Sequence, residues 1–300
     1  MIRVSWFFLI PLVLFAGIET YFKKAENKSN AHKMGDIDFI YMINLDPRSG
    51  KYERTMNAFR PYGINPYRFS AVNGWDLSFQ ALDELGIIFD DSMQSGPIAT
   101  VYRHVGGQEY VSHEIMKELG MTYYAHSLSR GAIGSLLSHL SVLQDAFDSG
   151  YNTIWVMEDD VRVVRSPYEI LSLICSLDNV DPNWDVLFTD HEIKGANGPV
   201  PCTVIRPRPL VQLQPLEYYL ERRQVAQDIE KIGMRFGSAS MVIRRSGMEK
   251  ILDFFKTYKI YFPYDIDCFF VPDIHLYALN KDIVTNSVGG DEVYLGKDEK

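Results

Sequence analysis

The chain of 300 residues is 46% apolar and 23% charged, which is ordinary for a folded protein with one large domain or two small ones. Its net charge of −9 at pH 7 argues against the basic stripe that nucleic-acid binding requires, so no nucleic acid is expected among its partners. Its three cysteines contain no CxxC pair, which argues against a zinc finger or a disulfide framework. Aromatic residues make up 13% of the chain, which favours a substantial core and stacking platforms for bases or sugars.

The N-terminus is strongly apolar. Residues 6–18 carry no charge, and basic residues lie on both sides of them. An uncharged run of about 15 residues is closer to the core of a signal peptide than to a full membrane span of about 20. We interpret residues 1–24 as a hydrophobic signal or membrane anchor and expect membrane association through residues 1–22, with export after signal cleavage as the alternative. Residues 25–36 are polar and are predicted to form a tether.

A β-α-β unit is predicted to open the folded domain. Residues 37–44 form an apolar strand, residues 51–59 a helix with one apolar face, and residues 67–72 a second strand. Because crossovers between parallel strands are right-handed, the two strands are expected to be parallel neighbours.

The next segment gives a mixed signal. Residues 76–127 are predicted to contain short helical pieces, broken at Gly96-Pro97 and Gly106-Gly107, and we interpret them as an insertion or a lid beside the site. Residues 131–147 carry apolar side chains at helical spacing and predict an amphipathic helix.

An acidic strand end follows this helix. Residues 154–157 form a short apolar run of the kind typical of a buried parallel strand, and Glu158, Asp159 and Asp160 come directly after it. Three neighbouring carboxylates resist ionising together, and a hard divalent cation removes that conflict. The segment therefore predicts a metal site of the kind that holds a diphosphate at the carboxyl edge of a sheet, or else a strand end with a solvated acidic turn.

The second half of the chain continues the alternation of strands and helices. Ser246, with Glu249 three residues later, predicts an N-cap. The alternation indicates one α/β domain over residues 37–290, with a C-terminal tail at residues 291–300. The predicted elements are helices at residues 168–177 and 246–258, strands at 184–189 and 238–244, a loop at 194–209, and a partly helical segment at 217–232.

Several ordered motifs together resemble one protein family. These motifs are Asn44-Leu45-Asp46 with Arg48 and Arg54, Arg130-Gly131-Ala132-Ile133-Gly134 with Ser138-His139, Met157-Glu158-Asp159-Asp160-Val161, Phe236-Gly237-Ser238-Ala239, and Pro263-Tyr264-Asp265. In their order and spacing they resemble glycosyltransferase family 25, which includes bacterial lipooligosaccharide galactosyltransferases and collagen hydroxylysine galactosyltransferases. The resemblance covers about residues 38–288 and departs from the family pattern at residues 76–127 and 217–231.

The resemblance implies a GT-A-like fold, in which a Rossmann-like, mixed and mainly parallel sheet is flanked by helices. It implies a metal-dependent, inverting transferase that moves a hexose, galactose in particular, from a UDP-sugar donor to a glycan or glycoconjugate acceptor such as lipooligosaccharide. The implied cofactor is Mn²⁺ or Mg²⁺.

Each motif has an expected role. Asp160 is predicted to bind the metal, Glu158 to contact metal or ribose, and Asp159 to bind either through water, because acidic oxygens suit a hard cation. On a strand, residues two apart face the same way, which would bring Glu158 and Asp160 together. The residues predicted to bind the donor are Asn44, Leu45, Arg48, Gly131, Gly134, Ser138, His139, Glu158 and Asp159.

A carboxylate is needed to take the proton from the acceptor hydroxyl. Asp265 is the first candidate and Asp267 the second, although either could instead complete the metal shell. Asp190 is the third, because it also follows a predicted strand.

Other interpretations stay open. His139 could be a structural histidine that braces the acidic strand, and Gly131 and Gly134 could serve close helix packing alone. Arg54 could pair with phosphate or lie on a solvated helix face. At the level of function, the alternatives are a metal-dependent phosphohydrolase and a non-catalytic carbohydrate-binding relic of the fold.

Overall fold

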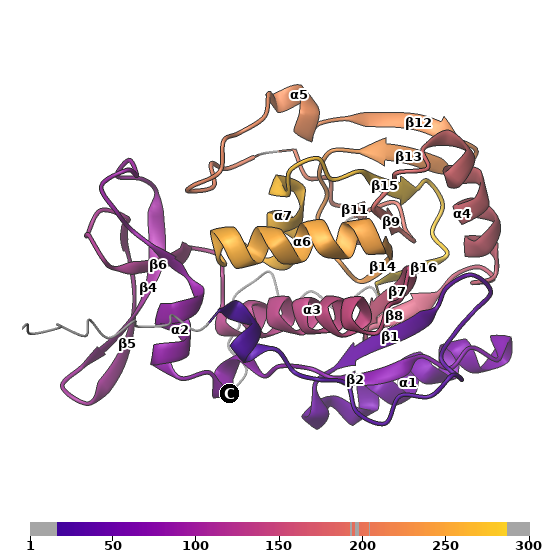
Figure 1. Ribbon diagram of the computed structural model, residues 1–300, viewed down its shortest axis with the longest axis horizontal. Helices are drawn as coiled ribbons and strands as arrows, with labels where there is room; N and C mark the ends of the chain where they lie inside the picture. Colours follow the sequence, from indigo (N-terminus) through magenta and orange to yellow (C-terminus); the bar gives the residue numbers. More distant parts are fainter. Residues whose placement is uncertain (1–16, 193, 196–197, 204, 287–300) are drawn as a thin grey trace, which may run out of the picture.

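The computed structural model describes residues 17–192, 194–195, 198–203 and 205–286 (Figure 1). Its centre is an eight-stranded sheet. Along the chain, its strands are β1 (Phe39–Asn44), β2 (Tyr67–Ser70), β7 (Thr153–Glu158), β9 (Val186–Phe188), β12 (Arg222–Ala226), β13 (Ile229–Ile232), β14 (Ser240–Arg244) and β15 (Leu276–Leu279).

The sheet is mixed and mainly parallel, as predicted. Its spatial order is β12-β13-β15-β9-β14-β7-β1-β2. β2, β1 and β7 pair in parallel, as do β15 and β9, whereas β14 runs antiparallel between β7 and β9. The β-α-β opening is confirmed, because α1 (Ser49–Phe59) connects β1 to β2 and Asn44 lies opposite Ser70.

Alternate side chains of β1 bury into two separate layers. Phe39 and Tyr41 belong to the core that contains residues of α3 (Arg130–Asp148) and α6 (Arg245–Tyr258), which lie side by side in Figure 1. Ile40 belongs to the opposite core, which contains residues of α1 and α4 (Glu169–Val180). Every residue of β1 is therefore buried, which explains why its sequence is a continuous apolar run rather than an alternating one.

The insertion at residues 76–127 contains one short helix, as predicted, but most of its regular structure is β-strand, which was not predicted. The turn of its hairpin is Gly106-Gly107, whose φ values of 60° and 82° favour glycine. The hairpin was not predicted because its second strand, residues 108–115, is largely exposed and shows no clear alternation of apolar and polar side chains. The insertion contains α2 (Phe79–Leu85) and a separate sheet made of β3 (Ile87–Ile88), β6 (Thr122–Ala125), β4 (Ile98–Val105) and β5 (Gln108–Ile115).

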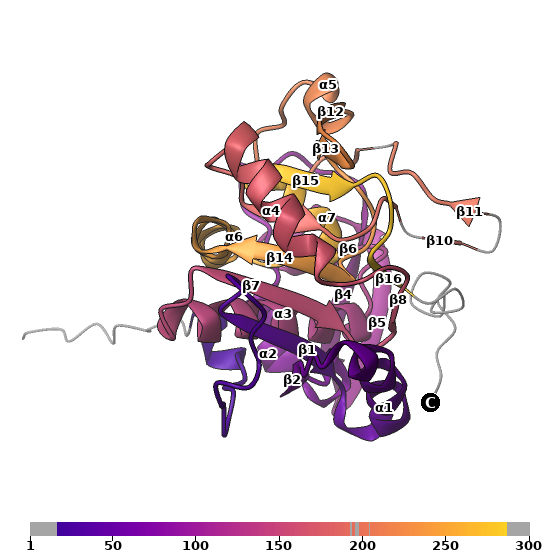
Figure 2. The same cartoon turned by 90° about the vertical axis from the view of Figure 1, so that its right-hand side faces the viewer.

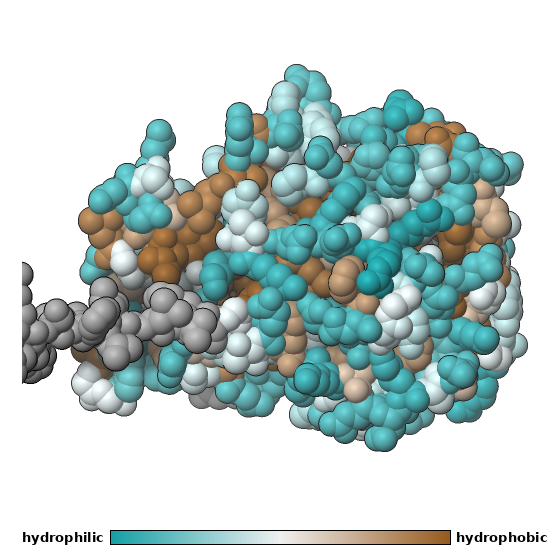
Figure 3. Space-filling view, viewed as in Figure 1, coloured by the Kyte–Doolittle hydropathy of each residue, from teal (hydrophilic) through white to brown (hydrophobic). Residues whose placement is uncertain are grey.

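This insertion projects from the main sheet at the left of Figure 1. In Figure 3, brown apolar surface gathers over the same region, around β4 and β6, whereas the surface over α3 and α6 is mostly hydrophilic. Exposed apolar side chains on its strands include Ile88, Ile98, Val105, Val111 and Ile115.

Residues 217–232 are helical over part of their length, as predicted, but only at their start. Only α5 (Leu216–Tyr219) is helical, and the rest forms the hairpin β12–β13, with Asp228 in the turn at φ 62°. β13 pairs with β15, so the backbone hydrogen bonds of this charged segment are made to the main sheet. Pairing with a distant strand therefore overrides the local helical tendency.

The predicted cap of α6 was also wrong. The helix begins after Arg244, which makes no side-chain capping bond. Ser246 instead donates from its hydroxyl to Oδ1 of Asp185 at 2.7 Å, so a long-range contact takes the side chain that a capping box would use.

The described part of the N-terminal region packs on the domain. Ile18 is buried, the backbone N–H of Lys23 donates to Ser141 on α3, and Lys28 pairs with Asp145 at 2.7 Å. Part of the predicted tether therefore lies against the protein. Within the described ranges, no helix has the length and apolar character needed to cross a membrane. Most of the predicted anchor and the whole predicted tail, residues 291–300, lie outside these ranges.

Candidate active site

Several strands meet at one edge of the main sheet. The carboxyl ends of β2, β1 and β7 lie together because the three strands are parallel neighbours, and β14 begins at the same edge because it is antiparallel to β7. In Figure 2 this edge lies on the right, where β8 (Val161–Val163) and β16 (Val284–Asn286) adjoin β7. Ligands of open α/β sheets bind beyond such carboxyl ends.

Glu158 is the last residue of β7 and is held by two side chains. Nε2 of His139, on α3, lies 3.2 Å from its Oε1, and the Ser238 hydroxyl donates to the same oxygen at 3.1 Å. Burial opposes ionisation of Glu158, but the bonds from His139 and Ser238 outweigh it and hold the pKa of Glu158 below its ordinary value. His139 is buried and stacks on Tyr264, with ring centroids 4.3 Å apart. His139 thus braces the acidic strand.

Asp159 turns toward β1. Its Oδ2 accepts a 2.6 Å hydrogen bond from Nδ2 of Asn44, and its backbone oxygen accepts from the Thr55 hydroxyl at 2.7 Å. Oδ1 of Asn44 accepts in turn from Nε of Arg68 at 2.7 Å. Burial raises the pKa of Asp159, and the bond from Asn44 counters part of that effect. Asn44 therefore links the ends of β2, β1 and β7.

Asp160 lies beyond the strand. β7 ends at Glu158, and Asp160 lies in the turn that leads to β8. The prediction that Glu158 and Asp160 face the same way because they alternate on one strand was therefore wrong. Burial and the nearby charge of Glu158 raise the pKa of Asp160 to about 6, although Nζ of Lys51 lies 3.7 Å from its Oδ2. The pKa values of Asp159 and Asp160 are therefore raised, as expected for neighbouring carboxylates that resist ionising together, whereas the pKa of Glu158 is lowered.

The residues at this edge suit a hard cation in part. Among the residues that the structure describes, no three His, Cys, Asp or Glu side chains are grouped to hold a metal ion. Glu158 and Asp160 are nevertheless oxygen donors whose mutual repulsion a cation would relieve. Mg²⁺ and similar ions are often held by one or two carboxylates together with substrate phosphates, so these two residues fit that mode of binding.

Asp265 joins this group from the far end of the sequence. It lies in α7 (Tyr264–Asp267), is buried, and accepts a 2.7 Å hydrogen bond on Oδ2 from the backbone N–H of Gly237. Gly237 has φ 85°, a conformation that favours glycine. Because Gly237 precedes Ser238, this turn connects the Asp265 carboxylate to the Glu158 carboxylate.

Asp267 is enclosed by the protein instead. Arg208 donates to both of its carboxylate oxygens, at 2.6 and 3.3 Å, and the backbone N–H groups of Tyr261 and Phe262 donate to Oδ2. Burial raises the pKa of Asp267 and the Arg208 guanidinium lowers it, with a raised pKa as the net effect. Both side chains of this ion pair are fully buried, which indicates a structural role.

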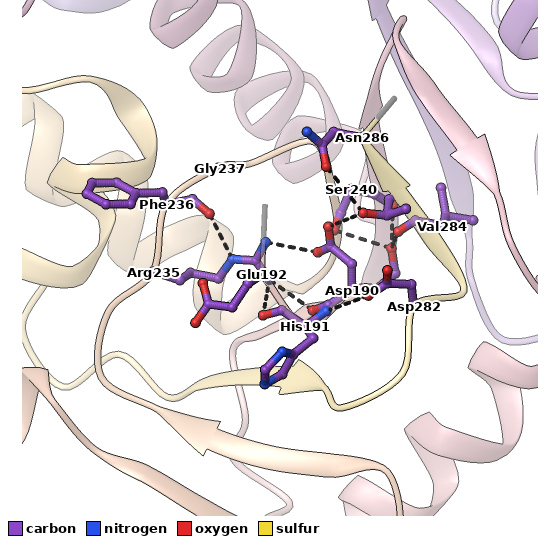
Figure 4. A network of polar contacts seen from close by, with 12 residues as sticks. Asp190, His191, Glu192, Arg235, Phe236, Gly237, Ser240, Asp282, Val284 and Asn286 are labelled. Carbon is purple, nitrogen blue, oxygen red and sulfur yellow. Dashed lines mark hydrogen bonds and ion pairs between the residues drawn. The ribbon is translucent and has the colours of Figure 1, made fainter. Parts of the chain in front are cut away.

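Asp190 is also enclosed (Figure 4). Arg235 lies 2.9 Å from its Oδ1, and the Thr285 hydroxyl donates to its Oδ2 at 2.8 Å. Arg235 additionally donates to the backbone oxygens of Asp190 and His191. These contacts hold the chain after β9 against the segment that leads into Gly237. Asp190 therefore helps to position that segment and has a structural role.

Ser138 and Gly134 fasten α3 to the loop after β2. The Ser138 hydroxyl accepts from the Val72 backbone N–H at 2.8 Å and donates to the Gly134 carbonyl at 2.7 Å. A Cβ at Gly134 would lie 2.5 Å from the Gly74 nitrogen, so close packing requires glycine there. Gly131 is exposed, and a Cβ there would meet only the Ser129 hydroxyl at 3.7 Å.

This contrast gives a prediction for stability. Gly134→Ala is expected to lower the free energy of unfolding by about 1–3 kcal/mol, because the backbone atoms of the loop must move to admit the methyl group. Gly131→Ala, three residues earlier on the same helix, is the matched control and should not destabilise the protein. Urea denaturation followed by circular dichroism measures both. Equal stability of the two variants would contradict the close packing seen at Gly134.

The remaining predicted donor residues lie at the end of β1. Leu45 precedes a short 3₁₀ helix, Asp46–Arg48, and packs against the core. Arg48 is exposed, its backbone oxygen accepts from Asn44 at 3.1 Å, and Arg54 is exposed on α1. Four residues without a predicted role also lie in the site, namely Lys51, Gly237, Ser238 and Tyr264. The last three lie within the recognised motifs, whereas no pattern marks Lys51.

A mainly parallel α/β sheet with carboxylates at the carboxyl ends of its central strands defines a GT-A-like, Rossmann-type protein. The sequence profile described as Glycosyltransferase family 25 (LPS biosynthesis protein) matches residues 37–270. The chain belongs to glycosyltransferase family 25.

Curated relatives match about half of the chain. A Drosophila melanogaster protein named Glycosyltransferase 25 family member is 28% identical over 142 residues, which are 47% of this chain and 19% of that protein. Human Procollagen galactosyltransferase 2 is 26% identical over 157 residues, 52% of this chain and 21% of that protein. Human Inactive glycosyltransferase 25 family member 3 is 24% identical over 126 residues, 42% of this chain and 17% of that protein. The chain thus spans about a fifth of the length of these relatives.

Proposed function

We propose that this protein transfers a hexose, galactose in particular, from a UDP-sugar to a hydroxyl group of a glycan or glycoconjugate such as lipooligosaccharide, with inversion at the sugar carbon. The observation that carries this proposal is the convergence of Glu158, His139, Ser238 and Asp265 at one sheet edge. The names of the procollagen galactosyltransferase relatives support galactose as the sugar. The family description as an LPS biosynthesis protein supports a glycolipid acceptor.

The reaction requires a base on the acceptor side. The acceptor oxygen attacks the anomeric carbon, the bond from that carbon to the diphosphate oxygen breaks, and UDP leaves on the opposite face. The acceptor proton passes to the Asp265 carboxylate, which the Gly237 N–H holds in orientation. We assign the base to Asp265 because the turn at Gly237 and Ser238 connects its carboxylate to Glu158. Asp267 and Asp190 pair with buried arginines, and we assign structural roles to them.

The reaction also gathers negative charge on the leaving diphosphate. Glu158 and Asp160 would hold Mn²⁺ or Mg²⁺, which when bound supplies Lewis-acid stabilisation of that charge. His139 and Ser238 keep Glu158 ionised and oriented. Asn44 and Asp159, which are hydrogen-bonded to each other, lie where the ribose and base of the donor would extend along the edge.

A donor screen tests this function. The full chain, incubated with Mn²⁺ and a panel of UDP-hexoses, should release UDP faster when lipooligosaccharide or simple glycosides are added. Release that is independent of any acceptor would favour the phosphohydrolase. Failure to release UDP, together with no thermal stabilisation by UDP and Mn²⁺, would favour the carbohydrate-binding relic, since a ligand that binds only the folded state must stabilise it.

Membrane association through residues 1–22 stays a prediction that rests on the apolar run at residues 6–18. It suits an acceptor carried on a lipid. Flotation of the full chain with lipid vesicles measures it, and a protein that remains entirely in the dense fraction would contradict it.

A further inference from the structure

Trp75 differs from the other two tryptophans that the structure describes. Its side chain is 55% exposed, whereas Trp155 and Trp184 are fully buried in the core. Leaving a large aromatic surface in water forgoes the stabilisation that its burial would give. A ligand that covers the indole would supply that burial.

The backbone of Trp75 is fixed even though its side chain is exposed. The Asn73 side chain accepts from the Trp75 N–H at 3.2 Å, and Nη1 of Arg130 donates to the Trp75 carbonyl at 3.5 Å. Gly74 is packed so closely on α3 that a Cβ there would lie 1.8 Å from the Arg130 carbonyl oxygen. The Arg130 guanidinium is itself held over the ring of Phe79, 5.2 Å from its centroid. The indole is therefore attached to a rigid support.

The segment that carries Trp75 leaves the main sheet from the edge that carries the carboxylates. Trp75 lies five residues after the carboxyl end of β2. Arg130 and Ser138 hold this segment, and both belong to α3. His139 of the same helix contacts Glu158. Along the edge, the order of strands is β2, β1, β7 and β14. Neighbouring strands are about 4.8 Å apart, so the end of β2 is roughly 10 Å from the end of β7.

We propose that Trp75 is the stacking platform for the nucleobase of the sugar donor. This inference rests on the proposed function and adds a binding role for Trp75. With the diphosphate at Glu158 and Asp160, the transferred sugar extends toward Asp265 on the β14 side. The ribose and base must then extend the other way, past Asn44 at the end of β1 and toward β2. Every base presents a π-face, and an exposed, rigidly mounted indole is well suited to stack on it.

Fluorescence gives a direct test, because stacking of a base on an indole quenches its emission. Trp155 and Trp184 are buried, and Trp6 lies outside the described residues, so Trp6→Phe serves as the background. In this background, UDP with Mn²⁺ should quench the emission, and the additional change Trp75→Phe should remove the quenching. By calorimetry, Trp75→Ala should weaken UDP binding roughly ten- to hundredfold, with Trp75→Phe in between.

The affinity for pyrophosphate distinguishes a loss of base stacking from damage to the fold. The affinity for pyrophosphate with Mn²⁺ should be the same in the parent and in Trp75→Ala, because pyrophosphate has no base. Tyr110→Ala, at an exposed aromatic residue on β5, is the matched control and should bind UDP like the parent. The inference is overturned if Trp75→Ala binds UDP like the parent, or if it loses UDP and pyrophosphate equally.

The result also distinguishes this inference from the proposed function. If the parent binds and releases UDP while the Trp75 variants behave like it, the transferase proposal stands and only the stacking role is lost. If the parent binds none of UDP, CDP, GDP and ADP, both are overturned.

Discussion

Replacing Asp265 with Asn is expected to reduce sugar transfer by about a thousandfold while leaving donor affinity within a few-fold of the parent value. A positioned general base typically contributes 10²–10⁴ in rate, and an amide cannot accept the acceptor proton. The oxygen of the introduced amide can still accept the Gly237 N–H, so the turn that leads to Ser238 should be kept. The measurements are initial rates of UDP release with acceptor and calorimetric titration of UDP with Mn²⁺.

Asp267→Asn is the matched control for Asp265→Asn, two residues away in the same helix. It leaves the buried Arg208 guanidinium without its carboxylate partner, and breaking a buried ion pair costs about 3–5 kcal/mol. We therefore expect a lower melting temperature, with transfer per folded molecule retained. Loss of metal-dependent UDP binding in Asp265→Asn would make Asp265 a metal ligand instead of the base. Full activity of Asp265→Asn would refute both roles.

The parts of this protein that the sequence predicts well are those that local burial determines. β1 and β7 are buried on both faces, so each reads as a short apolar run whatever its neighbours are. α3 presents its apolar side chains at helical spacing because it covers the sheet. The β-hairpins of the insertion and of β12–β13 carry no such signal. Their strands are partly exposed and lack a clear alternation of apolar and polar side chains. In addition, β13 pairs with β15, which lies far away in the chain.

The same distinction applies to the site. The acidic residues after β7 were predicted because a strand end marks them. The contacts that give them different properties join residues far apart in sequence, such as His139 with Glu158 and Gly237 with Asp265. Type and spacing ranked Asp265 before Asp267. The structure adds the contacts of each carboxylate, which are the buried Arg208 at Asp267 and the Gly237 N–H at Asp265.

Replacing Asp160 with Asn is expected to lower transfer by about a thousandfold and to remove the dependence of UDP binding on Mn²⁺. Charge stabilisation by a bound metal supplies several kcal/mol to such a reaction, and each 1.36 kcal/mol is a factor of ten in rate. An amide oxygen is a weaker ligand than a carboxylate for a hard cation. In metal-free buffer, the variant should be at least as stable as the parent, because Asp160 lies partly buried beside the like charge of Glu158.

A loss of activity without a loss of stability would distinguish a metal ligand from a residue that is needed for folding. A carboxylate kept only for folding would lower the melting temperature when replaced, whereas one kept for a metal would lower activity alone. Asp253→Asn, at an exposed acid on α6, is the control and should change neither quantity. Activity of Asp160→Asn close to that of the parent, with the same response to Mn²⁺, would overturn the metal role. The diphosphate would then have to be stabilised by the protein's own cations, of which Lys51 already lies beside Asp160.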